Sequence, residues 1–171
     1  YLIIEMPQTA IFKAFDFTES SDFENVLTKR SKRHFKNDIL PYIDTYEIKI
    51  KEQLSDSELQ KAYELFLNVK ENNLAINNFT YAFGLFEAMN KNNNWSFLQA
   101  LDPLNHEMVG VVFCYKNGTN NSFNPILIGM SDSDQHRLIL YRQLLFQTIL
   151  YAKKENFNKI YFGVSAIFEK R

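Results

Sequence analysis

The sequence has few of the features that mark secreted, membrane-spanning and metal-binding proteins. Its 171 residues include one cysteine, Cys114, so no internal disulfide can form and a reduced, cytoplasmic setting fits best. No apolar run reaches the ~18 residues of a membrane span. The first residues, Tyr1 to Glu5, lack the basic start of a signal peptide. The three histidines stand at no metal-ligand spacing, so no metal site is predicted.

An excess of charge of one sign is also missing. The 19 basic and 20 acidic residues give a net charge of −1, so no global field recruits nucleic acid or anionic lipid. Hydrophobic residues make up 46% of the chain, which is typical of a globular protein with a sizeable core. We expect residues 1–171 to form a single soluble domain. We also expect it to be cut from a longer bacterial polypeptide, because both ends adjoin strand-like runs.

Periodicity predicts the element order ββα-β-αα-βββ-α-β, which begins with a hairpin over residues 1–17. Residues 20–41 are predicted to form one helix that Pro41 ends. Alternating apolar and charged residues over 46–51 indicate a strand with one solvent-exposed face. Ser55 and Glu58 form a capping box at the start of the next helix.

The last three elements are a strand at 125–130, a helix at 140–154 and a strand at 159–165. If the two strands are parallel, the helix makes a right-handed β-α-β crossover. The sequence thus predicts an α+β, three-layer fold. Its central sheet is mixed and mainly antiparallel, with one such crossover and helices on both faces.

The crossover from Pro125 to Ala166 is where we expect chemistry. A helix that starts past the carboxyl end of a strand presents free N–H groups and a positive dipole end, which suit a phosphate. An ordinary crossover with solvated arginines explains the same pattern, so both interpretations stay open. The polar residues of this connection are Asp132, Ser133, Asp134, Arg137 and Arg142.

This segment resembles the carboxyl part of the GNAT acyltransferase fold. More narrowly, it resembles the branch with Fem-type aminoacyltransferases and the acetyltransferase-like domains fused to 8-amino-7-oxononanoate synthase-like enzymes. Thr28–Phe35 resembles the early basic helix of that branch, and Glu107–Phe113 resembles one of its strands. Asn156 stands at the first glycine of the recurrent motif LxxxLLxxxIxxAxxxGxxxxxFG. The matching positions are Leu140, Leu144, Leu145, Ile149, Ala152, Phe162 and Gly163.

The resemblance implies an acyl-CoA co-substrate whose acyl group is attacked directly by an amine. It implies that Ile128, Gly129 and Met130 pair with the pantetheine arm and that the strand at 162–166 splays away from them. A backbone N–H near Gly129 or Met130 would hold the oxyanion.

The resemblance also implies a pyrophosphate cradle at the start of the crossover helix. The usual signature, Gln or Arg followed by small residues, is not intact, because Leu140 and Arg142 replace the small residues. The residues of the expected cradle are Arg137, Leu138, Leu140, Tyr141, Arg142 and Gln143.

The catalytic candidates are Ser165, His136 and one of three possible bases. Ser165 is the only hydroxyl near the place where many GNAT enzymes carry a tyrosine acid. His136 precedes the crossover helix and could reach a thioester or a phosphate. Asp132 is a candidate base, as are Asp134 and Glu87, and the sequence does not choose among the three.

Three functions therefore remain open. The first is acyl-CoA-dependent transfer to a small amine. The second is Fem-type transfer from aminoacyl-tRNA, which the basic stretch over 29–36 favours, although a solvated helix face explains that stretch equally well. The third is an inactive GNAT-like module that binds a partner or tethers a fused enzyme domain. No membrane partner is expected.

Overall fold

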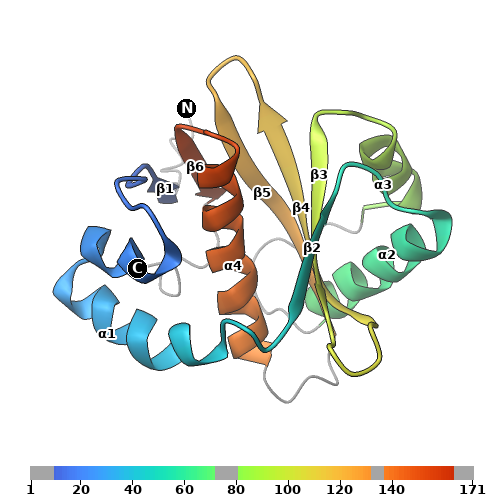
Figure 1. The fold of residues 1–171 in the computed structure, drawn as a ribbon. Helices are drawn as coiled ribbons and strands as arrows, with labels where there is room; N and C mark the ends of the chain where they lie inside the picture. The colour runs from blue at the N-terminus through green and yellow to red at the C-terminus, as the bar shows by residue number, and fades with distance from the viewer. Residues whose placement is uncertain (1–9, 72–80, 132–136, 164–171) are drawn as a thin grey trace, which may run out of the picture.

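The computed structural model describes residues 10–71, 81–131 and 137–163, which form a six-stranded sheet with helices on both faces (Figure 1). The sheet order is β1-β6-β5-β4-β3-β2. The strands are β1 (Ala10–Phe12), β2 (Glu47–Lys51), β3 (Trp95–Leu101), β4 (Met108–Asn117), β5 (Ser122–Met130) and β6 (Lys159–Gly163). The helices are α1 (Lys29–Asp38), α2 (Asp56–Glu71), α3 (Phe83–Asn90) and α4 (Arg137–Lys154), with 3-10 turns η1 (Ser20–Val26) and η2 (Leu40–Tyr42).

The pairing of the strands confirms the predicted fold class. Neighbouring strands are antiparallel except β5 and β6, which are parallel and are joined through α4. The described residues thus form an α+β fold with a mixed, mainly antiparallel sheet and one strand–helix–strand crossover. None of their helices has the length and apolar character needed to cross a membrane.

Two separate cores cover the faces of the sheet. Phe97, Val111 and Phe113 pack with α2 and α3 on one face, whereas Leu98 and Val112 pack with α1 and α4 on the other. Alternate residues of a strand point to opposite faces, so the near-continuous apolar runs of β3 and β4 are buried on both sides. Figure 1 shows α2 and α3 on one side of the sheet and α1 and α4 on the opposite side.

Local sequence signals explain where α2 begins. The Ser55 N–H donates to Glu58 Oε2 at 3.0 Å, and the Glu58 N–H donates to Ser55 Oγ at 3.4 Å. This reciprocal pair satisfies two N–H groups that have no acceptor inside the helix, as the predicted capping box requires.

The helix predicted over residues 20–41 is wrong as one continuous element. It is divided into η1 and α1 because Leu27 and Thr28 are extended, with ψ of 150° and 159°. The Thr28 hydroxyl then accepts from the Ser31 N–H at 3.3 Å and caps α1. Threonine forms this cap readily, and the cap starts a new helix where the apolar spacing suggested continuation. The first strand of the predicted hairpin lies in residues 1–9, outside the described residues.

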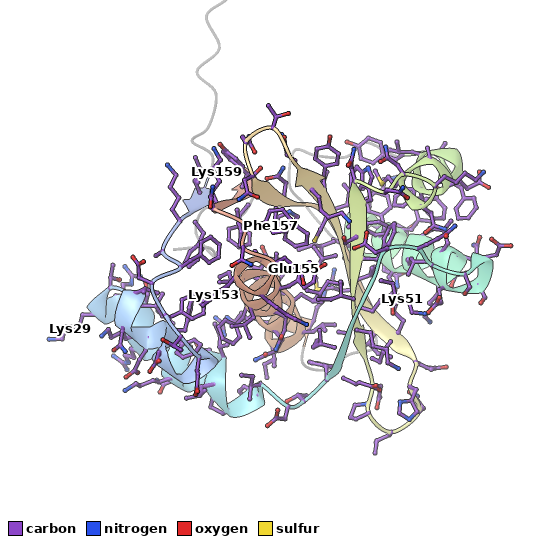
Figure 2. All side chains as sticks on the ribbon, turned by 45° about the horizontal axis from the view of Figure 1, so that its top comes forward. Lys29, Lys51, Lys153, Glu155, Phe157 and Lys159 are labelled. Carbon is purple, nitrogen blue, oxygen red and sulfur yellow. The ribbon has the colours of Figure 1, made fainter. Side chains whose placement is uncertain are left out.

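The carboxyl end of α4 explains why Asn156 stands where the related motif has glycine. Asn156 has a φ of +59°, in the left-handed region that glycine adopts most easily and asparagine tolerates. The Asn156 N–H donates to the Lys153 carbonyl at 3.0 Å, and the Phe157 N–H donates to the Ala152 carbonyl at 2.9 Å. This Schellman pattern ends the helix and directs Phe157 into the core ahead of β6 (Figure 2).

Candidate functional site

Among residues 122–131 and 159–163, β5 and β6 are paired only where they begin. Their parallel register joins Ser122 to Lys159 and Phe123 to Ile160. Beyond Ile160, the described part of β6 pairs with β1 on its other side, through Tyr161 and Gly163. In the described residues, the rest of β5 therefore has no strand partner on the side of β6. We call this place, where the described pairing of β5 with β6 ends, the β5–β6 fork.

The backbone of β5 turns polar groups towards the fork at Ile128 and Met130. The Ser131 N–H donates to the Val109 carbonyl of the neighbouring chain segment at 2.8 Å. Along an antiparallel pair, residues whose N–H and C=O groups bond to the partner strand alternate with residues whose N–H and C=O groups point away from it. Ser131 bonds to the β4 side, so Gly129, two residues earlier, also directs its N–H and C=O groups at β4. Ile128 and Met130 point the other way. No described strand pairs with their N–H and C=O groups there.

Gly129 has a packing role in addition to its place in the ladder. A Cβ built on Gly129 would stand 2.6 Å from the backbone nitrogen of Phe66, so α2 can approach the sheet closely only because this side chain is missing. The Gly129 N–H is directed at β4, so of the two expected oxyanion donors, Gly129 and Met130, the one whose N–H is directed at the fork is Met130.

The start of α4 offers fewer free amides than the resemblance implied. An α-helix joins the N–H of each residue to the carbonyl four residues earlier, so the amides of Tyr141, Arg142 and Gln143 are used within α4. The N–H groups that have no acceptor within α4 are those of its described first turn, Arg137, Leu138 and Ile139. The Leu138 side chain is 50% exposed.

Three side chains of the expected cradle contact other parts of the protein. Leu140 is fully buried in the core under α4. Gln143 is buried too, and its Nε2 donates to the Ile39 carbonyl at 2.7 Å. Arg142 Nη1 lies 3.3 Å from Asp38 Oδ2 at the end of α1. Gln143 and Arg142 thus fasten α4 to the α1–η2 segment, whereas Arg137 and Leu138 stand in the first turn of α4, where the resemblance places the phosphates.

The three catalytic candidates, Asp132, His136 and Ser165, lie outside the described residues. Their placement stays a prediction. Cys114 is buried, as its apolar strand predicted, and burial raises the pKa of its thiol well above the usual value. The described residues contain no group of three or more His, Cys, Asp or Glu side chains that could hold a metal ion.

A polar cluster that we did not predict lies on the α2 face of the sheet. Glu58 Oε1 accepts from Lys51 Nζ at 2.6 Å and from Gln99 Nε2 at 3.4 Å. Burial alone would raise the pKa of the Glu58 carboxyl, but hydrogen bonds from Lys51, Ser55 and Gln99 outweigh it and lower that pKa to about 2. The sequence signal for this cluster was Gln99, a polar residue in the middle of an otherwise apolar strand.

Comparison with solved structures assigns the fold. The chain is similar to L-PGS of Bacillus licheniformis, at 12% identity and a TM-score of 0.56, over 96% of this chain and 47% of that one. It is also similar to the C-terminal DUF2156 domain of a protein assigned as a lysylphosphatidylglycerol synthetase in Agrobacterium fabrum. There the identity is 9% and the TM-score 0.57, over 92% of this chain and 46% of that one.

A third similarity is to the ribosomal-protein-S18-alanine N-acetyltransferase of Escherichia coli. Its identity is 19% and its TM-score 0.47, over 65% of this chain and 63% of that one. A scan of protein-family models and a search of curated sequences returned no match.

These similarities and the sheet topology give the chain a GNAT-like fold, as the sequence predicted, without singling out the Fem-type branch. The chain spans about half the length of the first two of these proteins.

Proposed function

We propose that this domain transfers an acyl group from a thioester held in the β5–β6 fork to an amine. The observation that carries the proposal is the short pairing of β5 with β6, which in the described part of the chain extends only from Ser122 and Lys159 to Phe123 and Ile160. An extended pantetheine arm carries amide groups that can pair with a strand as a neighbouring strand would. The outward N–H and C=O groups of Ile128 and Met130 are suited to that pairing.

The proposed site also includes groups that would bind the CoA phosphates and stabilise the negative charge that develops on the thioester oxygen. A CoA pyrophosphate at the start of α4 would meet the N–H groups of the first helical turn, the positive dipole end and the guanidinium of Arg137. The Met130 N–H would stabilise the oxyanion that forms when an amine attacks the thioester carbonyl. The amine nitrogen forms the new amide bond and gives up one proton, the carbon–sulfur bond breaks, and the thiolate takes up one proton, so that CoA leaves as the thiol.

Calorimetric titration with acetyl-CoA tests this function. We expect saturable binding in the micromolar range, which Arg137→Glu weakens at least about tenfold through the loss of a phosphate partner. Lys91→Glu is the matched control, because Lys91 is exposed at the end of α3 on the other face of the sheet. Equal affinities of the two variants would remove the start of α4 as the phosphate site. The absence of any heat with the unmodified protein would remove the acyl-CoA proposal itself.

A second candidate function is aminoacyl transfer from charged tRNA, and the surface of α1 favours it. Lys29, Arg30 and Arg33 are exposed, and none of them has an ion pair among the described residues. Figure 2 shows Lys29 at the outer end of α1, directed away from the sheet. The name of one structural neighbour, a lysylphosphatidylglycerol synthetase, also concerns a lipid that carries an amino acid.

Filter retention of aminoacyl-tRNA at increasing salt separates the two donors. If tRNA is the donor, retention falls with salt, and Arg33→Glu reduces the slope of log K against log salt by about one unit, whereas Lys91→Glu leaves it unchanged. Binding of acetyl-CoA without retention of tRNA supports the first function. Absence of binding to both acetyl-CoA and aminoacyl-tRNA supports an inactive binding module.

A further inference from the structure

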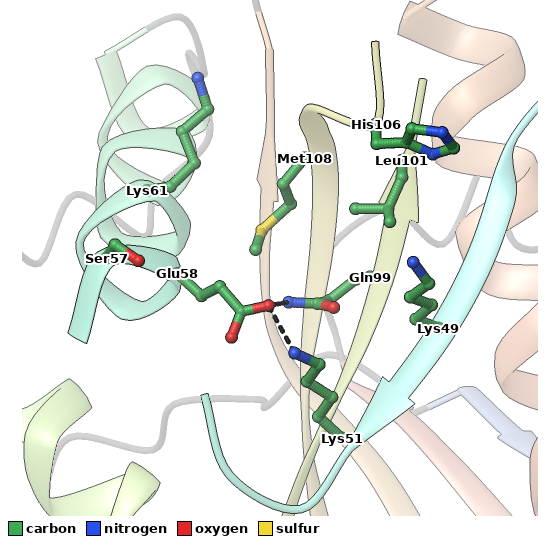
Figure 3. A pocket seen from close by; sticks show the side chains of 9 residues that line it. All are labelled: Lys49, Lys51, Ser57, Glu58, Lys61, Gln99, Leu101, His106 and Met108. Atoms are coloured by element: carbon green, nitrogen blue, oxygen red, sulfur yellow. Dashed lines mark hydrogen bonds and ion pairs between the residues drawn. The ribbon is translucent and has the colours of Figure 1, made fainter. Parts of the chain in front are cut away.

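A hollow of about 280 Å³ lies on the α2 face of the sheet, away from the β5–β6 fork. Its walls come from β2, β3, the start of β4 and the first turns of α2, with no residue from β5, β6 or α4 (Figure 3). This volume is near the lower end of the range for small-molecule sites. The hollow is lined by Lys49, Lys51, Ser57, Glu58, Lys61, Gln99, Leu101, His106 and Met108.

The lining carries more positive than negative charge. It holds three lysines and one carboxylate, Glu58, which pairs with Lys51 at 2.6 Å. Lys49 pairs at 3.1 Å with Glu47, which does not line the hollow. Lys61 has no ion pair among the described residues. One ammonium group in the wall is therefore uncompensated, and a second is compensated only from outside.

Glu58 is a fixed part of this wall and does not offer a cation site. Its Oε1 accepts from Lys51 and Gln99, and its Oε2 accepts from the Ser55 N–H at 3.0 Å and the Ser55 hydroxyl at 3.0 Å. Gln99 is only 1% exposed, so the amide that holds the carboxylate is itself held by packing. Both carboxylate oxygens are therefore already used by donors from the protein.

The far side of the hollow is apolar. Leu101 and Met108 are each 7% exposed and belong to the core between the sheet and α2. Figure 3 shows Lys49 and Lys51 on the strand side of the hollow and Lys61 on the helix side, with Met108 between them. An occupant would therefore meet ammonium groups and an apolar surface at the same time.

We propose that this hollow binds a small organic anion, namely a carboxylate on a short apolar chain. The carboxylate lies by the ammonium groups of Lys61 and Lys49, and the chain covers Met108 and Leu101. An ammonium ligand is disfavoured because the only carboxylate of the lining is already paired. Inorganic phosphate would gain the charge contacts but would leave the apolar side uncovered. The site shares no residue with the fork, so it stands independently of the acyl-transfer proposal.

Titration with sodium hexanoate, followed through the methyl signal of Met108 in carbon–proton NMR spectra, tests the site. We expect a saturable shift of this signal with hexanoate, none with hexylammonium chloride, and weaker binding when salt is added. Lys61→Gln should raise the dissociation constant about tenfold, whereas Lys61→Arg should largely restore it. Lys91→Gln, at an exposed position on α3, should leave it unchanged.

Three results would overturn the proposal. The first is no saturable shift of Met108 with hexanoate in a protein whose spectrum is otherwise that of a folded chain. The second is an equal response to hexylammonium, which would mean that the apolar surface alone attracts the probe. The third is tighter binding of inorganic phosphate than of hexanoate, which would make the hollow a general anion site. Because acetyl-CoA binding is measured separately, failure here leaves the fork proposal unaffected.

Discussion

Gly129 of β5 lies against the backbone of Phe66 in α2, where a Cβ would stand 2.6 Å from the Phe66 nitrogen. Gly110 of β4 faces the opposite side of the sheet, where a Cβ would stand 3.1 Å from the Cδ1 atoms of Leu140 and Leu144. The first contact is with backbone, which moves only if α2 moves. The second is with the ends of flexible side chains. The two glycines therefore set the distance of one helix from each face.

Alanine at these two positions should have unequal costs. Gly129→Ala is expected to lower the free energy of unfolding by about 2–3 kcal/mol, because α2 must shift away from the sheet. Gly110→Ala is expected to cost about 1 kcal/mol or less, because the two leucines can change rotamer and the strand loses a flexible residue. Urea unfolding followed by circular dichroism measures both. If both variants lost the same free energy of unfolding, the proposed difference between the backbone contact of Gly129 and the side-chain contacts of Gly110 would be wrong.

The left-handed backbone conformation of Asn156 predicts that glycine at this position stabilises the protein. Glycine at the left-handed position after α4 removes the steric cost that a side chain meets there, so Asn156→Gly should raise the free energy of unfolding by about 0.5–1 kcal/mol. Asn156→Ala keeps a Cβ without the local hydrogen bonding of asparagine, and it should lower that free energy. Thermal and urea unfolding of the three proteins would show the order Gly, Asn, Ala. A less stable glycine variant would mean that the Asn156 side chain is itself needed.

The low pKa of Glu58 predicts a stability that depends on pH. Its folded pKa of about 2 lies below the ordinary value of 4.5, so the folded state favours the carboxylate. The resulting stability is fully present above pH 4.5 and is lost as the pH falls towards about 2. Glu58→Gln should therefore be less stable than the unmodified protein at neutral pH and should approach it near pH 2.

Unfolding by urea across this range measures the effect of Glu58. Glu64→Gln is the control, since Glu64 is exposed on the same helix. Its effect on stability should be small, because exposed charges contribute little to stability. If Glu58→Gln and Glu64→Gln gave parallel curves, the contacts of Glu58 with Lys51 and Gln99 would not favour its charged form.

The burial of Cys114 predicts that its thiol reacts slowly with thiol reagents in the folded protein. It is the only cysteine, it is buried in β4, and burial raises its thiol pKa well above the usual value. Since the thiolate is the nucleophile, labelling requires both exposure and deprotonation. A disulfide reagent should label the native protein orders of magnitude more slowly than the unfolded protein, at a rate set by opening of the sheet. Fast labelling under native conditions would show that β4 opens locally.

Much of the secondary structure could be predicted from local sequence patterns. The capping box at Ser55 and Glu58 and the alternation over 46–51 act between residues that are close in the chain, so the sequence displays them directly. The division of the predicted helix over 20–41 was missed. Phe23 and Phe35, which suggested one helical face, pack on each other from two separate elements at a centroid distance of 5.2 Å. Helical spacing cannot distinguish one long helix from two segments that share a core.

The sequence by itself determined the order of the described strands and of helices α2, α3 and α4, the mixed sheet with its crossover helix, and the burial of Cys114, because propensity and periodicity act over a few residues. The tertiary structure alone decided which groups meet across long separations. Examples are Gln99 with Glu58, Arg142 with Asp38, and the side of β5 on which Ile128 and Met130 present their amides. These depend on strand register and on helix packing against glycine, and a register shift of one residue turns every side chain to the other face.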